Sequence, residues 1–332
     1  MSMVVIDESG AVVGIENNRL TIKCRDGLRS FPIETIDSIT ILGHSQMTTA
    51  CIQHCLAYGI PVSFLSRGGK YFGYLQSTGH VNTFRQRRQC ALYDEDFAMN
   101  LSRNIVMAKI KNQQVVLRRY EGEHKAELAE AEHMLVICEN KARIAPKYDT
   151  LMGYEGQAAK AYFQGLAAVV DPDFHFSGRN RRPPKDEFNS LLSLGYSILM
   201  NELYAAIERK GMNPYFGFLH RDGEHHPTLA SDMMEEWRAV IVDSTVMSLI
   251  NGHEIHKHDF QFDDTDEGCY LTKEGLRIFL AKLDRKMQAH NRYLSYTDYA
   301  VSFRQGIDLQ MDALARAVES GDADIYHPIR IR

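Results

Sequence analysis

Short runs of β-branched and aromatic residues dominate the first 85 residues of the chain. The runs read VVIDE, AVVGIE, RLTIKC, LRSFPI and SITILG, and turn dipeptides such as Ser-Gly and Asp-Gly separate them. This pattern is typical of strands joined by tight turns. One helical segment, with Thr48 or Thr49 as its cap, interrupts the runs before the strand VSFLS. We therefore expect a small β-rich domain over residues 1–88.

From about residue 92 the apolar positions recur at the three- and four-residue spacing of amphipathic helices. The first predicted helices span residues 94–119, 123–143, 150–167 and 188–210. The last seven residues, YHPIRIR, follow the final predicted helix, and we expect them to fray. The chain is therefore predicted to be an α+β protein, in which a larger helical domain over residues 92–332 follows the β-rich one.

Composition narrows the choice of compartment and partner. No apolar run approaches the ~20 residues of a membrane span, and the first residues lack the basic and apolar regions of a signal peptide. We therefore expect a cytoplasmic protein without membrane contact. The net charge of −5 argues against a protein that coats nucleic acid over its whole surface, although local basic clusters can still contact it. Two such clusters are Arg85, Arg87 and Arg88, and Arg179, Arg181, Arg182 and Lys185.

Candidate chemistry is densest around His220, which ends an apolar segment and precedes a polar loop. A helix capped by Thr228 is predicted after this loop, and it carries the carboxylates Asp232, Glu235 and Glu236. Spacings of three and four residues place carboxylates on one helical face, where like charges repel unless a positive group lies among them. A divalent metal with oxygen and imidazole ligands would remove this repulsion. Solvated side chains that complement the helix dipole are the alternative.

A second informative carboxylate, Glu155, lies in the predicted helix over residues 150–167. It falls within the apolar stripe formed by Leu151, Ala158, Ala159, Tyr162 and Leu166. A buried carboxylate without a partner would cost several kcal/mol or become protonated. Glu155 is therefore expected either to open into a polar cleft or to meet a cation, and a structural salt bridge would satisfy the second condition.

Three separated segments now point to one family. They are MGYEGQAAKAYF around Glu155, GRNRRPPKDEFNSLLSLGYSILMNELY, and GMNPYFGFLH followed by LASDMMEEWR. In this order and spacing the chain closely resembles the CRISPR-associated endonuclease and integrase family, the catalytic subunit of spacer acquisition. The resemblance covers almost the whole length. It implies a small N-terminal β domain that serves in dimerisation, a larger all-helical catalytic domain, and a homodimer.

The resemblance also implies a set of site residues. Glu155, His220 and Glu235 match the positions that hold a divalent metal, Mg²⁺ or Mn²⁺. Asp232 matches a second acidic position and is either a further ligand or a base outside the ligand set. These four are the expected catalytic residues. Glu236 has no match in the family pattern, and we interpret it as a surface residue.

The implied reaction is attack by the 3′-hydroxyl of a DNA fragment on a phosphodiester of the CRISPR repeat, with hydrolysis as the same displacement by water. The expected partners are double-stranded DNA and a small ferredoxin-like protein that bridges two dimers. A nuclease of branched DNA and a non-catalytic DNA-binding scaffold are the alternatives. The candidate DNA contacts are Arg179, Arg181, Arg182, Lys185, Tyr162, Asn189 and Tyr196. The polar line Asn189, Ser193 and Tyr196 on the helix over residues 188–210, like Tyr162, is equally open to a packing role.

Overall fold

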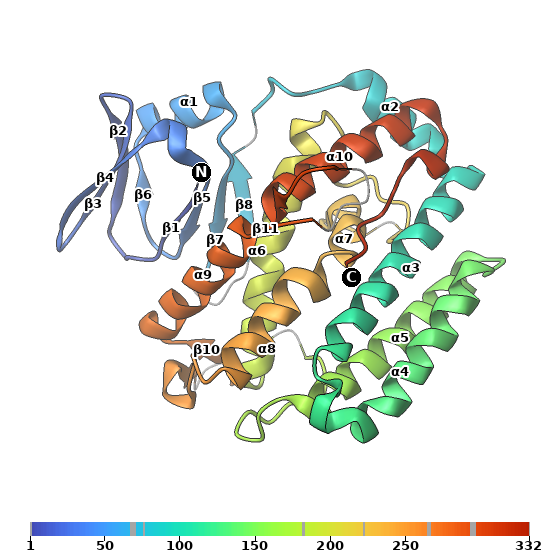
Figure 1. Ribbon diagram of the computed structural model, residues 1–332. Helices are drawn as coiled ribbons and strands as arrows, with labels where there is room; N and C mark the ends of the chain where they lie inside the picture. Colours follow the sequence, from blue (N-terminus) through green and yellow to red (C-terminus); the bar gives the residue numbers. More distant parts are fainter. Residues whose placement is uncertain are drawn as a thin grey trace. The chain divides into compact units, whose positions relative to one another are not determined.

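Strands dominate the start of the chain and helices dominate the rest, as the sequence predicts (Figure 1). The computed structural model describes residues 2–66, 71–75, 77–180, 183–221, 223–263, 267–292 and 297–331. The chain divides into two units, Met1–Val81 and Asn82–Arg332. The predicted α+β fold, with a small β-rich part before a larger helical part, is therefore confirmed.

The described residues of the N-terminal unit form two four-stranded sheets. One sheet has the order β1-β5-β7-β8, in which the first three strands run parallel and β8 is antiparallel to β7. The other has the order β4-β3-β2-β6, with antiparallel pairs except between β2 and β6. The strands are β1 (Ser2–Ile6), β2 (Val12–Glu16), β3 (Arg19–Cys24), β4 (Gly27–Pro32), β5 (Ile36–Leu42), β6 (Gln46–Met47), β7 (Val62–Leu65) and β8 (Tyr71–Leu75).

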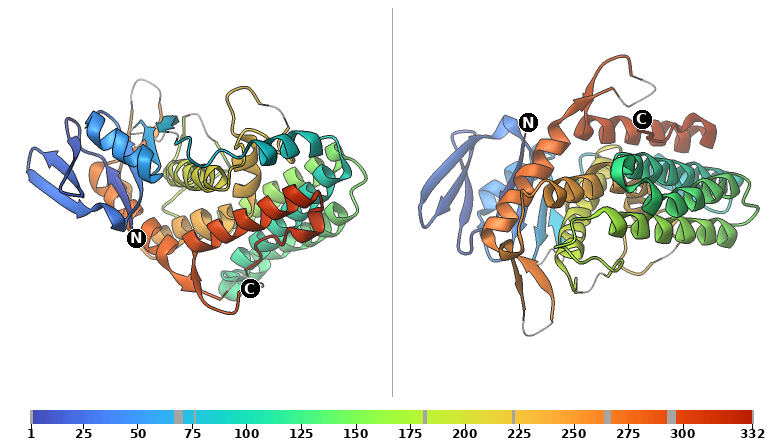
Figure 2. Two further views of the ribbon diagram at one scale, coloured as in Figure 1. Left: turned by 90° about the horizontal axis from the view of Figure 1, so that it is seen from above. Right: turned by 60° about the horizontal axis from the view of Figure 1, so that its bottom comes forward.

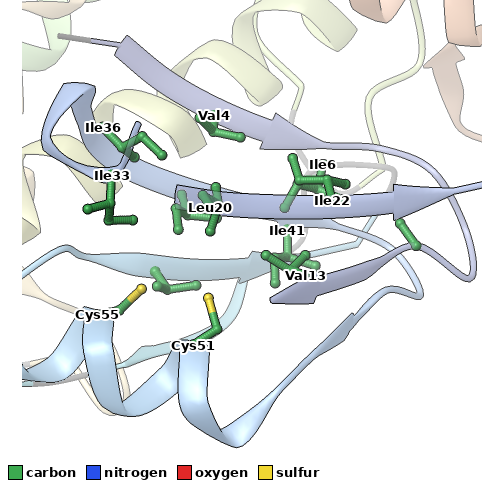
Figure 3. Packing of buried hydrophobic residues seen from close by; sticks show 13 residues of the cluster. Val4, Ile6, Val13, Leu20, Ile22, Ile33, Ile36, Ile41, Cys51 and Cys55 are labelled. Atoms are coloured by element: carbon green, nitrogen blue, oxygen red, sulfur yellow. The ribbon is translucent and has the colours of Figure 1, made fainter. Parts of the chain in front are cut away.

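Apolar side chains from these strands and from helix α1 (Thr49–Tyr58) form one core. Figure 3 shows strand residues such as Leu20 and Ile41 and the helix residues Cys51 and Cys55 in this cluster. Helix α1 begins where predicted, because the Thr48 hydroxyl accepts the N–H of Cys51 at 3.3 Å. It ends at Gly59 with φ of 66°, a left-handed conformation that favours glycine.

The helical unit is built mainly from long helices. Helices α3, α4 and α5 pack side by side (Figures 1 and 2). The helices are α2 (Thr83–Leu92), α3 (Asp96–Arg118), α4 (Glu121–Arg143), α5 (Tyr148–Val169), α6 (Glu187–Arg209), α7 (Thr228–Glu235), α8 (Ser244–Asn251), α9 (Lys273–Gln288) and α10 (Phe303–Ser320). A π-helical turn, η2 (Arg238–Asp243), follows α7, and a 3-10 turn, η4 (Ala323–Ile325), follows α10. Among the described residues, this unit also has two antiparallel strand pairs, β9 (Phe260–Phe262) with β10 (Cys269–Leu271), and β11 (His290–Asn291) with β12 (Val301–Ser302).

Helix α2 belongs to the helical unit, so the division falls at Val81 and not near residue 88 as expected from the sequence. The reason is visible in its hydrogen bonds. Arg85 pairs with Glu319 of α10 at 2.8 Å, and the Gln89 side chain accepts the N–H of Asn213 at 2.8 Å. These contacts tie the helix to the C-terminal part of the chain.

The expectation that the C-terminal tail frays is wrong. Tyr326, Ile329 and Ile331 are buried, and the tail lies against α3 (Figure 1). The buried Asn112 of α3 donates to the carbonyl of Ile329 at 2.9 Å and accepts the N–H of Ile331 at 2.9 Å. Ile329 and Ile331, at alternate positions, are therefore part of the core. The exposed charged residues of the segment hide this apolar pattern in the sequence. Across the residues that the structure describes, the helices are all too short or too polar to cross a membrane.

Candidate active site

The loop that carries His220 is fixed by one carboxylate of α7. Asp232 is fully buried, and its Oδ2 accepts the backbone N–H groups of Phe218 and Leu219 at 2.6 and 2.9 Å. Its Oδ1 accepts the backbone N–H of His220 at 2.8 Å and lies 2.8 Å from Nδ1 of the same imidazole. Both oxygens are therefore engaged inside the protein, and Asp232 acts as an anchor that leaves Nε2 of His220 for other partners.

The same close approach explains two neighbouring residues. A Cβ at Gly217 would lie 2.9 Å from Asp232 Oδ2 and 2.8 Å from the backbone of Thr228, so the loop requires glycine there. The predicted role of Thr228 as a helix cap is wrong. Its hydroxyl accepts the N–H of Gly217 at 2.9 Å and donates to the carbonyl of Tyr215 at 2.6 Å, so it binds the His220 loop instead of its own helix.

Glu155 and Glu235 come together through a lysine. Lys109 of α3 pairs with Glu155 of α5 and with Oε2 of Glu235, at the end of α7, at 2.5 Å. The expectation that Glu155 opens into a cleft or meets a cation is resolved in favour of the cation. Arg238 adds a second positive charge, since its Nε donates to Oε1 of Glu235 at 3.0 Å. His220 Nε2 lies 3.9 Å from the same oxygen.

The sequence interpretation missed Lys109 and Arg238 as members of this site, although both left a signal. Lys109 lies between the buried residues Ala108 and Ile110 in an apolar part of α3. A lysine at such a position needs a counter-charge for the same reason that Glu155 does. Arg238 follows Glu235 by three residues, a spacing at which helical side chains meet.

The charges of the site stabilise one another. Burial alone would raise the pKa of Glu235, but Arg238, Lys109 and His220 outweigh it and lower that pKa to about 2. Burial lowers the pKa of Lys109, yet the charges of Glu235 and Glu155 raise it above its ordinary value. Burial also opposes the imidazolium of His220, whose pKa is nevertheless raised by Asp232 and Glu235. Glu235 and Lys109 are therefore ionised at neutral pH.

The donor set fits a divalent cation if Lys109 gives way. Among the described residues no three histidine, cysteine or acidic side chains already form a complete ligand group. Two carboxylates instead share the ammonium group of Lys109, so this position accepts a cation between them. Carboxylate oxygens with a single imidazole suit Mg²⁺ or Mn²⁺ better than a structural zinc. Glu155, His220 and Glu235 are thus a suitable ligand set, and Asp232 is the residue that orients the histidine.

Tyr162 and Tyr196 have internal roles. Both hydroxyls donate to Asp243 at the end of the π-helical turn η2, at 2.9 and 2.5 Å, and both side chains are buried. Burial raises the pKa of Asp243 to about 6. The guanidinium carbon of Arg238 lies 4.7 Å from the ring centroid of Tyr196. The tyrosines therefore hold η2 and Arg238 in place and do not offer the direct DNA contacts considered from the sequence.

The remaining DNA-binding candidates divide into three kinds. Asn189 is fully buried and shapes the preceding loop, since it donates to the carbonyl of Gly178 at 2.9 Å and accepts from Arg179 at 2.5 Å. Arg179 also lies over the ring of Tyr196 at 5.1 Å. Lys185 is exposed and pairs with Glu267 at 3.1 Å. Arg181 and Arg182 lie outside the described residues.

Glu236 is also placed differently from the expectation. It is fully buried, not on the surface, and it accepts hydrogen bonds from Gln310 at 2.7 Å, Tyr326 at 2.7 Å and the N–H of Ile329 at 2.6 Å. Burial raises its pKa to about 8. Neighbouring helical residues point about 100° apart, so Glu235 faces Lys109 while Glu236 faces the C-terminal tail.

Comparison with known proteins gives a consistent result. A family model described as CRISPR associated protein Cas1 matches residues 4–285. A CRISPR-associated endonuclease Cas1 from Mycobacterium tuberculosis (strain CDC 1551 / Oshkosh) is 34% identical over 335 residues, which cover 100% of this chain and 96% of the relative. A solved Cas1 protein from Thermotoga maritima superposes with a TM-score of 0.82 at 25% identity, covering 97% of this chain and 98% of that one. A chain of a Cas6-RT-Cas1–Cas2 complex superposes with a TM-score of 0.86 at 27% identity, covering all of this chain and 36% of that one.

Proposed function

The chain belongs to the CRISPR-associated Cas1 family, and we propose that it is a metal-dependent DNA endonuclease and integrase that inserts DNA fragments into a CRISPR array. The name of the Mycobacterium tuberculosis relative supports the endonuclease. Integration is the finer part of the proposal. It rests on the family resemblance and on a site that can activate either a 3′-hydroxyl or water against a phosphodiester.

The convergence of Glu155, Glu235 and His220 is the observation that carries the proposal. These residues come from α5, from the end of α7 and from the loop before α7, and two of them share a cation. A purely structural ion pair needs one carboxylate for one lysine. Here Glu235 binds both Lys109 and Arg238, and Nε2 of His220 lies 3.9 Å from the same carboxylate. Two carboxylates and an imidazole together match the ligands of a hard divalent ion.

In this proposal Glu155, His220 and Glu235 hold Mg²⁺ or Mn²⁺. A bound divalent ion would favour deprotonation of the attacking hydroxyl and stabilise the negative charge that develops on the phosphoryl group. Asp232 keeps Nε2 of His220 directed at Glu235 by accepting at Nδ1. Lys109 would have to leave its place between the carboxylates when the ion binds, and its ammonium group would then be able to donate to a phosphate oxygen. Arg238 keeps Glu235 ionised.

The proposed partners are DNA, a second copy of this chain and a small ferredoxin-like protein. The solved complex with a similar chain is named for both Cas1 and Cas2, which supports an assembly with a second adaptation protein. We propose that the β-rich unit serves in dimerisation, and that the small partner bridges two dimers. Two active sites would then meet the two ends of one DNA fragment.

The test is incorporation of a labelled double-stranded fragment into a repeat-containing plasmid with the small partner present. Reactions with Mn²⁺ or Mg²⁺ are compared with EDTA, and the wild type with Glu155→Gln. Glu254→Gln is the matched control, because Glu254 pairs with Lys282 as Glu155 pairs with Lys109. Glu254 is not one of the three candidate ligands. Metal-dependent joining that only Glu155→Gln abolishes is the expected result.

Other outcomes would redirect the proposal. Nicking of the plasmid without joining would favour a nuclease of branched DNA. DNA binding with neither nicking nor joining would favour a scaffold without catalysis. Full activity of a folded Glu155→Gln or His220→Ala variant would refute the assignment of the ligands.

A further inference from the structure

Arg221 directly follows the candidate ligand His220, and its ion pair is with an exposed carboxylate. Its side chain is 38% exposed. Its guanidinium carbon lies 4.4 Å from the ring centroid of Tyr93 and 5.2 Å from that of Tyr148. Within the part of the chain that the structure describes, its ionic partner is Asp94 at 3.6 Å, and that carboxylate is 88% exposed.

The backbone around Arg221 is held from two sides. Asp232 accepts the N–H groups of residues 218–220, as described above. From the other side, the Tyr148 hydroxyl donates to the carbonyl of Leu219. Tyr148 therefore fixes the loop with its hydroxyl and the guanidinium of Arg221 with its ring. The position of Arg221 relative to His220 is set by the same groups that set the histidine.

Tyr148 also relates Arg221 to Glu155. Tyr148 and Glu155 both lie on α5 and are separated by seven positions, or about two helical turns. They therefore share one face of the helix, about 10 Å apart along its axis. The Tyr148 ring, which contacts the guanidinium of Arg221, and the Glu155 carboxylate, which pairs with Lys109, thus lie on the same face of α5. Arg221 lies beside the candidate active site, at a separation that the helix keeps constant.

Stacking and charge together define what Arg221 can bind. A guanidinium that lies over aromatic rings uses its faces for the cation–π contact, while its N–H groups point outward in its plane and remain able to donate. An exposed ion pair such as that with Asp94 contributes little and is easily exchanged. Arg179 makes a useful contrast, because it also lies over a tyrosine but spends its Nη1 on Asn180, Asn189 and Ser193.

We propose that Arg221 is a phosphate-binding residue that grips the DNA backbone beside the reacting phosphodiester, with Tyr93 and Tyr148 as its aromatic supports. The ligand is a backbone phosphate, which accepts paired N–H donors from arginine in a fixed geometry. This inference rests on the proposed function, because it takes DNA as the substrate. It adds a contact that positions the strand and that reads no base.

The test is the salt dependence of DNA affinity, measured in EDTA so that the duplex stays intact. One phosphate contact contributes a slope of about 0.9 to the fall of log affinity with log salt. Arg221→Gln is expected to weaken binding of a labelled duplex and to reduce the slope by about that amount. Asp94→Asn, which removes the competing carboxylate, is expected to strengthen binding at low salt. Arg221→Lys keeps the charge and is expected to retain most of the slope.

Arg277→Gln is the matched control. Arg277 is 62% exposed on α9 and pairs with an exposed carboxylate at 3.4 Å, that of Glu274, as Arg221 pairs with Asp94. This variant is expected to keep the wild-type slope. The rise of melting temperature on addition of Mn²⁺ provides a second readout, and Arg221→Gln is expected to keep it because His220 remains anchored by Asp232.

The outcomes separate the inference from the proposed function. A wild-type slope in Arg221→Gln overturns the phosphate contact while leaving the function intact. A lower slope accompanied by loss of the Mn²⁺-induced rise also overturns it, because the residue would then support the loop. If the wild-type protein fails to bind DNA, the proposed function and the inference fall together.

Discussion

At the scale of single residues, the site is explained by the cost of burying charge. Glu235 and Lys109 are buried and Glu155 is partly buried, and each of these charges lies against an opposite one. A buried pair of opposite charges adds little net stability, whereas removal of one partner leaves an uncompensated charge. The three residues therefore depend on one another, and the proposed divalent ion would take the place of the lysine.

Lys109→Met is predicted to destabilise the metal-free protein by about 3 kcal/mol, because the partly buried Glu155 loses its ion pair and the buried Glu235 is left with Arg238. Addition of Mn²⁺ should recover part of that loss by supplying a new counter-charge. Chemical denaturation in EDTA and in Mn²⁺ measures both effects. Lys282→Met, which breaks the more exposed pair with Glu254, should cost less than about 1 kcal/mol. Equal stability of the two variants in EDTA would contradict the prediction.

Asp243 makes a prediction about pH. Its pKa in the folded protein is raised by burial from 3.8 to about 6, so its contribution to stability is complete below 3.8 and is lost as the pH rises to 6. An asparagine side chain at this position cannot ionise. The stability of Asp243→Asn relative to the wild type should therefore increase by about 3 kcal/mol in total across this window and stay constant above it. Urea denaturation at several pH values measures the difference, and a flat profile would contradict it.

At the scale of elements, the end of α7 is the point where the site and the C-terminal tail meet. Glu235 pairs with Lys109 of α3, and the next residue, Glu236, binds the tail at Tyr326 and Ile329. Asn112, three positions after Lys109, also reaches the tail and donates to the carbonyl of Glu236 at 2.8 Å. Helix α3 therefore supports α7 twice, once through the charges of the site and once through the tail.

Asn112→Ala is predicted to lower stability by about 2 kcal/mol or more, because the buried carbonyls of Glu236 and Ile329 and the N–H of Ile331 lose their partners. Thermal or chemical unfolding measures the loss. Asn100→Ala provides the comparison, since Asn100 lies on the same helix but is exposed. The prediction fails if the two substitutions have the same small effect.

At the scale of the whole molecule, every candidate ligand belongs to the unit Asn82–Arg332. A metal that binds the folded site stabilises the unit that contains it by about 2.7 kcal/mol at a hundredfold excess over its dissociation constant. The unit Met1–Val81 has its own core, and proteins of several units need not unfold in one step.

Calorimetry should therefore show that Mn²⁺ raises the unfolding transition of the helical unit, while a transition of the β-rich unit stays at the same temperature. Glu155→Gln should remove the rise, because the ligand set becomes incomplete. An equal shift of the whole thermogram in the variant would show that the ion binds elsewhere.

The local pattern of the sequence was sufficient to predict the β-rich start and the long helices α3 to α6, because periodicity follows from which face of each element is buried. It did not predict helix α2 or the short strands β9 to β12. The same rule predicted that Glu155 needs a cleft or a cation, since a carboxylate in an apolar stripe is costly wherever the stripe packs. Family motifs then singled out Glu155, His220 and Glu235. None of these arguments depends on which elements meet in space.

Only the tertiary structure decided the partners. Lys109 and Glu155 lie on different helices, so no local pattern could pair them. Asp232 became an anchor and not a free carboxylate because the chain before it folds back onto α7. Glu236 was interpreted as a surface residue and the tail as frayed because each is buried by segments distant in sequence. Gln310 and the tail cover Glu236, and Asn112 and Glu236 bind the tail. Burial of a charged residue is a property of two segments together, and a sequence shows each of them alone.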